Sequence, residues 1–560
     1  MMLADELKKI IKGDVATDEA TLESRSRDYS IFKVTPEAVV FPKDADDVKA
    51  LVKFVSAARK KGKKISLTGR AAGTDMTGGP LSESIVVDFT RYMNRIKEIK
   101  DSSAGSGQAY AVVEPGLYFR GLEPELAKRG LIYPSYPASK DLCAIGGIVM
   151  NNSGGEKTLQ YGKTDQYVEQ LKVVLADGEE HVVKPVSRGA LAECAKKHDF
   201  ESMAWKKLRR LLERHAEEIV RARPDVSKNS SGYSLWNVWD GNTFDPVKLF
   251  VGSQGTLGLM TEVTLRLVPR PAHSQLIVIF LRDLRHIGEL VNTLLPFKPE
   301  SIESYDDKTL GVVLRYLPGF IRSMKGDFFK LIWKFLPEVG MVLSGGGIPK
   351  MVLLVSLTAH DEGELRARTI KLVQAVRRDF RVPVRAVKDK GEEEKYWSIR
   401  RQSFALLHGH IKDRDTAPFI DDIAVRPQYL PEFLPQLNAI LEQYKDSLIY
   451  TIAGHPGDGN FHIIPLMDLK KPEIRALIPQ ISDKVYALVF KYRGTITAEH
   501  NDGMIRTPYL AKMYGKAAAA LFGEVKDCFD PLGIFNPGKK VGGTLKYALE
   551  HISSAREDKK

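Results

Sequence analysis

The glycine-rich segment at residues 68–79 limits the fold more than any other stretch of this sequence. It reads Thr68-Gly-Arg-Ala-Ala-Gly-Thr-Asp-Met-Thr-Gly-Gly79, with four glycines in twelve residues. It ends a predicted strand–helix–strand unit. Valine and leucine recur at helical spacing between residues 48 and 55, Asp44 is a suitable cap for this helix, and the strand after it is predicted at residues 64–68. Successive backbone N–H groups in such a loop can hold a diphosphate. The alternative is a flexible surface loop.

Two further glycine-rich segments follow, at residues 141–155 and 249–258. Small residues in the first of them allow close approach to a large flat ligand, and Asn151, Asn152 and Ser153 offer hydrogen bonds. The second leads into a predicted strand at residues 260–268, after which Pro269 and Pro271 mark a boundary. The pattern therefore indicates a first domain with three glycine-rich loops.

Two histidines seven positions apart, His455 and His462, lie with three glycines between two apolar runs, of which the first, residues 447–453, is predicted to be a buried strand. A tight turn between strands places such residues side by side, and imidazole is the commonest metal ligand near neutral pH. Glu499 offers the carboxylate of a two-histidine, one-carboxylate site, which leaves positions open for substrate. His500 is placed for a general base beside the metal. The alternative is a hairpin with two surface histidines.

Composition excludes several other classes of protein. The chain has 560 residues, no apolar run of transmembrane length and no signal-peptide core at its start, so we expect a cytoplasmic protein. Its three cysteines are far apart, which argues against disulfides, an iron–sulfur cluster or a zinc knuckle. The net charge of +12 favours an anionic substrate or membrane surface, because no nucleic-acid-binding motif accompanies it.

Taken in order, these segments resemble the FAD-linked 2-hydroxy-acid dehydrogenases of the vanillyl-alcohol oxidase / p-cresol methylhydroxylase superfamily. This branch includes D-lactate dehydrogenases, glycolate oxidase subunits and D-2-hydroxyglutarate dehydrogenases. Residues 68–79 are similar to its pyrophosphate loop, and residues 144–147 and 152–155 to its isoalloxazine and ribose segment. The stretch Val251-Gly-Ser-Gln-Gly-Thr-Leu-Gly258 is similar to another family motif. Residues 454–462, 499–503 and 536–539 match its C-terminal signatures.

The resemblance implies an α+β protein in three parts. Residues 1–270 would form a two-subdomain FAD-binding domain of the p-cresol methylhydroxylase type, residues 271–503 an α/β cap (substrate) domain, and residues 504–560 helices that return to the FAD domain. The first loop has no histidine, so non-covalent FAD is implied. The implied cofactor-binding residues are Thr68, Gly69, Arg70, Ala71, Ala72, Gly73, Thr74, Asp75, Gly78, Gly79, Pro137, Ser139, Asp141, Ala144, Ile145, Gly146, Gly147, Asn151, Asn152, Ser153, Gly154, Gly155, Gly252, Gly255, Thr256, Gly258 and Asn536.

The implied reaction is oxidation of a D-2-hydroxy acid to the 2-oxo acid. A divalent metal (zinc, manganese or iron) would bind His455, His462 and Glu499, and His500 would take the hydroxyl proton. Within Trp397-Ser-Ile-Arg-Arg401, Arg400 aligns with the family's substrate-carboxylate arginine, with Arg401 as the fallback.

The predicted substrate is a small monocarboxylic acid, D-lactate first and glycolate second. The family's hydroxyglutarate members carry a lysine where this chain has Ile420, and a polar residue where it has Ile464. Electrons would pass to a quinone, to dioxygen, or to an iron–sulfur or other electron-transfer protein. Two alternatives stay open. One is an enzyme like alkyl-dihydroxyacetone-phosphate synthase, although Asn501 follows His500 where that group has further histidines. The other is a non-catalytic flavin-bearing electron-transfer subunit.

Residues 311–350 depart from the family pattern as an insertion rich in aromatic and basic residues. Lysines at 325, 330 and 334 lie among phenylalanines and Trp333, a composition that suits a bilayer interface. We therefore expect peripheral binding to the inner face of the cytoplasmic membrane. The alternative is packing of this insertion on the cap or on a partner subunit.

Overall fold

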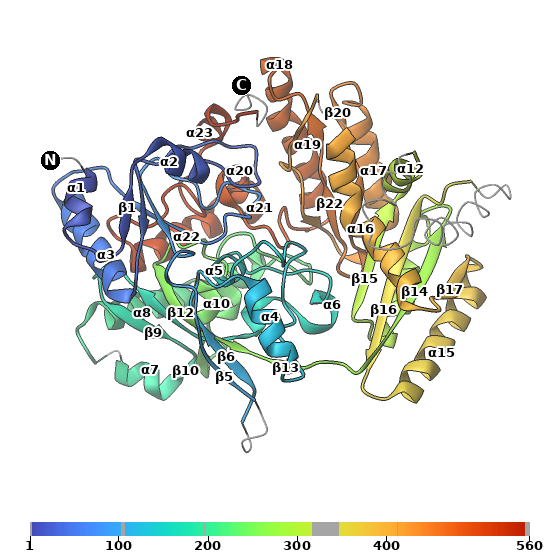
Figure 1. The fold of residues 1–560 in the computed structure, drawn as a ribbon, viewed down its shortest axis with the longest axis horizontal. Helices are drawn as coiled ribbons and strands as arrows, with labels where there is room; N and C mark the ends of the chain where they lie inside the picture. The colour runs from blue at the N-terminus through green and yellow to red at the C-terminus, as the bar shows by residue number, and fades with distance from the viewer. Residues whose placement is uncertain (1–2, 102–106, 195, 316–346, 411–412, 555–560) are drawn as a thin grey trace.

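The computed structural model describes residues 3–101, 107–194, 196–315, 347–410 and 413–554. Figure 1 shows the elements of roughly the first half of the chain, in blue and green, beside a second group in yellow and orange. Helices near the C-terminus, in red, lie back among the first group. Residues 316–346, which hold most of the predicted insertion and all of its lysines at 325, 330 and 334, lie outside the described residues.

A small sheet carries the first glycine-rich loop at the end of strand β3. Strands β2, β4 and β3 pair in parallel, and β1 adds an antiparallel edge. Parallel neighbours need a crossover connection. Helix α3 provides one, capped as predicted by the Asp44 carboxylate, which accepts from two backbone N–H groups. These elements are β1 Asp14–Ala16, β2 Ala38–Phe41, α3 Ala45–Lys60, β3 Leu67–Arg70 and β4 Ile85–Asp88.

A second sheet of five antiparallel strands, in the order β5-β6-β12-β8-β9, receives the other two glycine-rich segments. The segment at residues 249–258 leads directly into the central strand β12, and that at 141–155 contains helix α5. One apolar core joins these strands to helices α4, α5, α8 and α10. The elements are β5 Ile96–Lys100, β6 Tyr110–Val113, α4 Phe119–Ala127, α5 Ile145–Met150, β8 Val168–Val174, β9 Glu180–Val183, α8 Phe200–Arg214, α10 Val247–Phe250 and β12 Leu259–Arg266.

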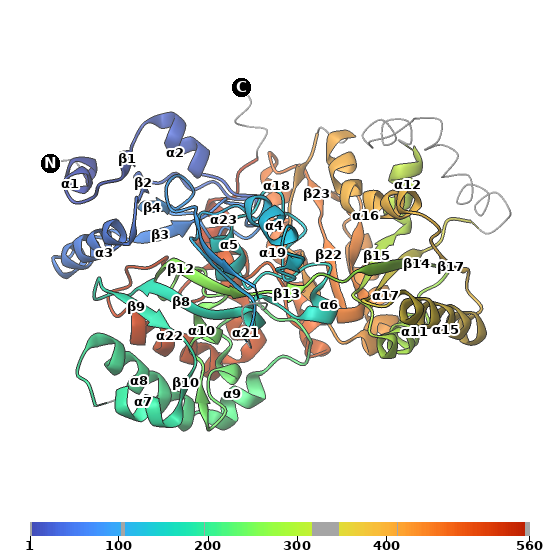
Figure 2. The ribbon, with the colours of Figure 1, turned by 60° about the horizontal axis from the view of Figure 1, so that its bottom comes forward.

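The third large sheet is the antiparallel sheet β17-β14-β16-β15-β21-β22-β19. Its strands β15 and β16 are buried along their whole length rather than alternating, because helices cover both faces. Ile277 and Ile279 face a core with α11, α15, α17 and α19, whereas Leu276 and Val278 face α12 and α16. Figure 2 shows the sheet between these helices. The elements are β14 His273–Leu281, α11 Ile287–Leu294, β15 Ser301–Asp306, α12 Asp307–Arg315, β16 Met351–Ala359, α15 Glu362–Phe380, β17 Val384–Ala386, α16 Lys390–His410, β19 Ile423–Ala424, α17 Leu430–Glu442, β21 Ile452–His455, β22 Asn460–Ile463 and α19 Leu477–Lys491.

The predicted histidine hairpin forms at one side of this sheet, between β21 and β22. Ala453 pairs with His462 and His455 with Asn460, so both imidazoles lie on one face as diagonal neighbours. Gly459 makes the turn possible. Its φ is +64°, and a Cβ there would stand 1.7 Å from the Val425 carbonyl oxygen.

The C-terminal part of the chain packs against elements of both the second sheet and the first. Helix α22 (Lys516–Phe529) packs on α8, with the Phe529 ring 5.2 Å from the Trp205 ring. The Leu67 backbone N–H then donates to Ile534, and that of Asn536 donates back to Leu67, which places residues 534–536 alongside β3. Residues 516–536 therefore contact helix α8 and strand β3 of the first part of the chain.

Among the described helices, none combines the length and the apolar character that a membrane-crossing helix requires. All three cysteines are free thiols.

Some predicted boundaries differ from the observed ones. The strand predicted at 64–68 runs instead from Leu67 to Arg70, because pairing begins where residue 67 meets both β4 and the C-terminal segment. The single strand predicted at 447–453 divides into β20 (Leu448–Ile449) and β21, which belong to different sheets. Tertiary pairing sets these limits, and local composition does not encode it.

Asn536→Ala should destabilise the protein, because the Asn536 amide donates to the buried carbonyl oxygens of Gly79 and Gln254 at 3.0 and 2.7 Å. Leaving these acceptors unpaired should cost about 2–4 kcal/mol in the free energy of unfolding, measured by denaturant titration. Asn237→Ala, at an exposed site, is the control and should change it by less than about 0.5 kcal/mol. Equal effects of the two substitutions would contradict this role.

Candidate active site

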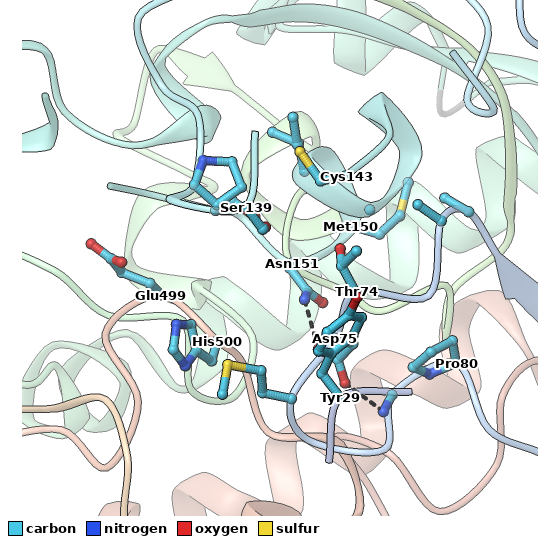
Figure 3. Close-up of a pocket in the computed structure, with 18 of the residues that line it drawn as sticks. Tyr29, Thr74, Asp75, Pro80, Ser139, Cys143, Met150, Asn151, Glu499 and His500 are labelled. Atoms are coloured by element: carbon cyan, nitrogen blue, oxygen red, sulfur yellow. Dashed lines mark hydrogen bonds between the residues drawn. The ribbon is translucent and has the colours of Figure 1, made fainter. Parts of the chain in front are cut away.

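One cavity runs from the three glycine-rich segments to the histidine hairpin, as Figure 3 shows for part of its lining. Glu499 and His500 lie at one end of that view, and Thr74 and Pro80 lie at the other. Most of the residues predicted to contact cofactor, metal or substrate line this cavity. They are Gly69, Arg70, Ala71, Ala72, Gly73, Thr74, Asp75, Gly79, Pro137, Ser139, Ala144, Gly146, Gly147, Asn151, Ser153, Gly154, Gly155, Gly255, Gly258, Arg400, His455, His462, Glu499 and His500.

Eight residues predicted to contact the cofactor do not line this cavity, and their contact with the cofactor stays a prediction. The Thr68 hydroxyl donates to Asn536, and the Asn152 side chain accepts from the Asp165 backbone. Asp141 is exposed, and Ile145 packs in the apolar core. The eight are Thr68, Gly78, Asp141, Ile145, Asn152, Gly252, Thr256 and Asn536.

The first glycine-rich loop fits a diphosphate. The Asp75 carboxylate holds its shape by accepting from the backbone N–H groups of Thr77 and Gly79 and from the Asn151 amide, at 2.8–3.0 Å. Among the hydrogen bonds of the described residues, none uses the backbone N–H groups of residues 71–74. These four donors therefore remain available to an anion, which is the arrangement that a phosphate-binding loop requires.

The second glycine-rich segment fits a flat ring for two separate reasons. A Cβ on Gly155 would stand 2.2 Å from the Tyr136 carbonyl oxygen, so this glycine permits close packing of the segment itself. A Cβ on Gly147 would meet only the Ala71 methyl, at 3.9 Å, and would otherwise enter the cavity. The cavity wall is therefore flat at Gly147 because no side chain occupies that space.

The three predicted metal ligands converge. His455 Nε2 lies 3.2 Å from His462 Nε2 and 3.7 Å from Glu499 Oε1, and His462 Nε2 lies 4.0 Å from Glu499 Oε2. Ligand atoms at about 2.0–2.1 Å from a tetrahedral zinc ion are about 3.3 Å apart. The three side chains are 14% exposed or less. The set fits one divalent cation.

Carboxylates behind the two histidines orient them toward that point. His455 Nδ1 lies 2.5 Å from Glu303, and His462 Nδ1 lies 3.2 Å from Asp421. An imidazole that donates its Nδ1 proton to a carboxylate presents an unprotonated Nε2, which is the usual arrangement of zinc-bound histidine. Two such Nε2 lone pairs facing each other repel unless a cation lies between them. This geometry supports the metal prediction.

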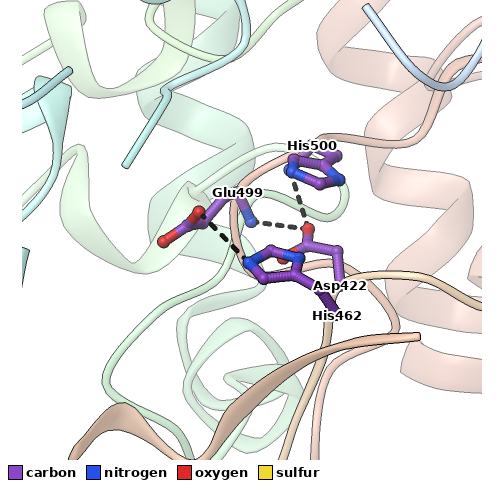
Figure 4. Close-up of side chains that lie close together, drawn as sticks. All are labelled: Asp422, His462, Glu499 and His500. Atoms are coloured by element: carbon purple, nitrogen blue, oxygen red, sulfur yellow. Dashed lines mark hydrogen bonds and ion pairs between the residues drawn. The ribbon is translucent and has the colours of Figure 1, made fainter. Parts of the chain in front are cut away.

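A second grouping of possible ligands overlaps the first, as Figure 4 shows. It consists of Asp422, His462, Glu499 and His500, whose ligand atoms lie within 4.8 Å of one another. Asp422, however, already accepts through Oδ2 from the Thr497 hydroxyl and from the backbone N–H groups of Glu499 and His500, each at 2.7 Å. Its carboxylate is therefore committed to holding the chain that carries Glu499, and we assign the ligand set to His455, His462 and Glu499.

Lys228 supplies the compensating charge next to Glu499. Its buried Nζ lies 2.8 Å from Glu499 Oε1 and 3.0 Å from Asp458 Oδ2. Burial raises the pKa of Glu499, but Lys228, His455 and His462 lower it more, so that its pKa lies well below the usual value. Glu499 is therefore an ionised carboxylate, the form that binds a cation.

His500 lies beside the same point, with its ring stacked on that of His462 at 5.1 Å. Its Nδ1 lies 2.9 Å from Asp421, which leaves Nε2 as the nitrogen available for proton transfer. Burial lowers the pKa of His500, but the carboxylates of Asp422 and Asp421 outweigh it and raise the pKa to about 9. A bound cation nearby would lower this pKa, because it repels the imidazolium.

Arg400 lines the cavity from helix α16, and its guanidinium lies 3.3 Å from Glu303. Its Nε is buried without a hydrogen-bond partner among the described residues. A buried guanidinium with an unused donor suits a ligand carboxylate. The side chain of the fallback residue, Arg401, lies outside the described part of the chain.

Sequence reasoning missed Lys228, Glu303 and the Asp421–Asp422 pair, all of them buried. One signal could have found part of this set, because two consecutive aspartates that directly precede a short apolar strand need partners when they are buried. Glu303 gave no signal, since β15 mixes polar and apolar residues. Lys228 gave no such signal, because nothing around it in the sequence indicates burial.

Comparison with known proteins agrees with this geometry. Residues 36–184 match the model of an FAD binding domain, and residues 270–540 match that of the C-terminal domain of FAD linked oxidases. The two matches define an FAD-dependent oxidoreductase. Within that class, the chain belongs to the FAD-linked oxidase family. The predicted fold class and the predicted flavoprotein oxidoreductase are confirmed.

Two relatives illustrate the range of named activities. A D-2-hydroxyglutarate dehydrogenase from Pseudomonas putida is 28% identical over 94% of this chain and 50% of its own length. A D-lactate dehydrogenase from Anaerostipes hadrus is 25% identical over 95% of this chain and 94% of its own. The chain spans about half the length of the first four relatives that it matches, all named D-2-hydroxyglutarate dehydrogenase.

A solved structure of p-cresol methylhydroxylase with bound substrate has the same fold. It covers 97% of this chain and 96% of its own with a TM-score of 0.67, at 16% sequence identity.

Gly147→Leu should reduce FAD occupancy to a small fraction of that of the unmodified protein, because the new side chain occupies the flat part of the cavity. Absorbance of the purified protein near 450 nm measures the FAD content per chain, which should fall on the order of tenfold. Gly121→Leu, in the exposed face of helix α4, is the matched control and should retain its flavin. Normal flavin content in the Gly147 variant would show that the ring does not lie there.

Proposed function

We propose that the protein oxidises a small D-2-hydroxy acid to the corresponding 2-oxo acid. The observation that carries this proposal is the position of the His455–His462–Glu499 cluster in the same cavity as the glycine-rich segments. A Cβ at Gly154 would stand 3.0 Å from Glu499 Oε1, so a segment predicted to hold flavin directly abuts a predicted metal ligand. An acid bound at the cluster would therefore adjoin the cofactor.

Each residue has a distinct proposed role. FAD supplies the hydride acceptor, and a divalent cation on His455, His462 and Glu499 supplies a Lewis acid for the substrate hydroxyl. Arg400 binds the substrate carboxylate with its guanidinium, which lines the cavity, and fixes which side of the acid faces the glycine-lined wall. His500 accepts the hydroxyl proton at Nε2, while Asp421 on Nδ1 stabilises the imidazolium that forms.

The uncharged part of the cavity lining on and beside strands β21 and β22 favours a small acid. Ile464, Thr451 and Ala453 line the cavity there, and none of them can balance the charge of a second carboxylate. Ile420, also used in predicting a small acid, is fully buried and does not line the cavity, so it supports no inference about the substrate. D-2-hydroxyglutarate is the second candidate, because four relatives carry that name.

The cysteine content supports an electron acceptor that is separate from this chain. Three free cysteines in separate parts of the chain supply no iron–sulfur ligand set. We therefore propose that electrons leave through a quinone or a separate electron-transfer protein, with an anionic membrane surface as a further proposed partner.

Anaerobic mixing with a panel of D-2-hydroxy acids tests this function. D-lactate should bleach the flavin absorbance fastest, followed by glycolate, and L-lactate should leave it unchanged. Glu499→Gln should lose metal and slow bleaching at least about a hundredfold while retaining FAD. His500→Gln should keep metal and substrate binding, but its flavin should bleach as slowly as that of Glu499→Gln. No bleaching by any acid in metal-loaded protein would refute the proposed activity.

Ile464→Lys should shift the preference toward D-2-hydroxyglutarate, because it adds a cation to an uncharged part of the wall. The ratio of kcat/KM for D-2-hydroxyglutarate to that for D-lactate should rise about tenfold or more, which corresponds to one new ion pair. Ile464→Leu is the control and should leave the ratio unchanged. An unchanged ratio in the lysine variant would place the distal end of the substrate elsewhere.

A further inference from the structure

Glu303 contacts both halves of the proposed reaction site. It lies on strand β15, with a side chain that is 3% exposed. Its Oε1 lies 2.5 Å from His455 Nδ1, and its Oε2 lies 3.3 Å from the guanidinium of Arg400. One carboxylate therefore joins a proposed metal ligand to the proposed substrate-binding arginine.

The position of Glu303 follows from the sheet. Strand β15 pairs with β21, where Ser304 is opposite Gly454, so residue 303 lies close to the start of the histidine hairpin. Gly454 has no side chain, and a Cβ there would stand 2.3 Å from the Asn460 carbonyl oxygen, which keeps the hairpin compact. The two strands hold the Glu303 carboxylate against the imidazole without any flexible connection.

Resting on the proposed function, we propose that Glu303 is a positioning residue that sets the affinity of the metal site and the orientation of Arg400 together. By accepting the Nδ1 proton of His455, its carboxylate fixes the tautomer in which Nε2 is free to ligate, and makes that nitrogen more basic. By pairing with one terminal nitrogen of Arg400, it holds the guanidinium at the wall of the cavity that Arg400 lines.

Both contacts of Glu303 need a hydrogen-bond acceptor, and an uncharged glutamine can supply an acceptor to only one of them. A glutamine at 303 can still accept the His455 proton through its amide oxygen, so the ring keeps its direction but loses the basicity that a charge confers. The same amide presents an N–H group toward Arg400, a donor facing a donor. The substitution should therefore weaken metal binding moderately and displace the guanidinium.

Glu303→Gln should raise the Kd for Zn²⁺ or Mn²⁺ about 10- to 100-fold. FAD-loaded protein is first stripped with a chelator, and each metal alone is then titrated in competition with a chelating dye. Glu300→Gln is the matched control, because Glu300 is also buried and paired with a cation, Lys157 at 2.9 Å, but does not contact the histidines. The control should keep the Kd of the unmodified protein within about threefold.

Steady-state kinetics at saturating metal distinguish a positioning role of Glu303 from a merely structural one. With the metal restored, kcat of Glu303→Gln should recover to within a few-fold, whereas KM for the D-2-hydroxy acid should remain about tenfold higher because Arg400 is misplaced. If Glu303→Gln does not fold, Glu303→Asp replaces it, and its shorter side chain should show the same rise in both Kd and KM.

Each outcome is decisive. A metal Kd and a KM equal to those of the Glu300→Gln control would overturn the positioning role. A rise in metal Kd without a rise in KM would also overturn it, because the coupling to Arg400 would be absent. If the unmodified protein binds no metal in the same titration, the proposed metal site fails, and this result is distinguishable from failure of the inference about Glu303.

Discussion

The contact between two imidazole nitrogens governs the rest of this site. His455 Nε2 and His462 Nε2 face each other at 3.2 Å in a place that solvent hardly reaches. Carboxylates on both Nδ1 atoms make both facing nitrogens acceptors, and two acceptors at that distance repel each other. The rings nevertheless keep this orientation. They are held by the hairpin, by the neighbouring strand β15 and by the aspartates at 421 and 422. A cation between the rings would remove this repulsion, which is why the geometry supports the proposed metal site.

The carboxylate that completes the cluster depends on both halves of the molecule. The segment that carries Glu499 is held on one side by Asp422 and on the other by the buried ammonium group of Lys163, which donates to the Ala498 carbonyl at 2.5 Å. Ser230 donates its backbone N–H to Thr497 from the same side. Since Lys163 and Ser230 belong to the first half of the chain, closure of the two halves on each other is what places Glu499. The proposed metal site and the cavity therefore both depend on contact between the two halves of the chain.

The sequence predicted the glycine-rich loops, the histidine hairpin and the convergence of Glu499 and His500, because each is encoded by neighbouring residues with an unusual composition. It did not predict the carboxylates and lysine that orient them. Glu303 is about 150 residues from His455, and Lys228 is about 270 from Glu499, so only the tertiary fold brings them together. For the same reason, several residues predicted to contact the cofactor do not line the cavity; Asn536, for example, donates to the backbone of Gly79 and Gln254. Each such residue lies in a recognisable local motif, but the packing of distant strands decides whether its side chain faces the cavity.

The most direct test of this account is the location of the metal itself. Crystals of the protein loaded with zinc, measured on both sides of the zinc absorption edge, would give an anomalous difference map. The account predicts one peak about 2.0–2.1 Å from His455 Nε2, His462 Nε2 and a Glu499 oxygen. A peak coordinated by Asp422 and His500 without His455, or no peak at the hairpin in fully loaded crystals, would contradict it.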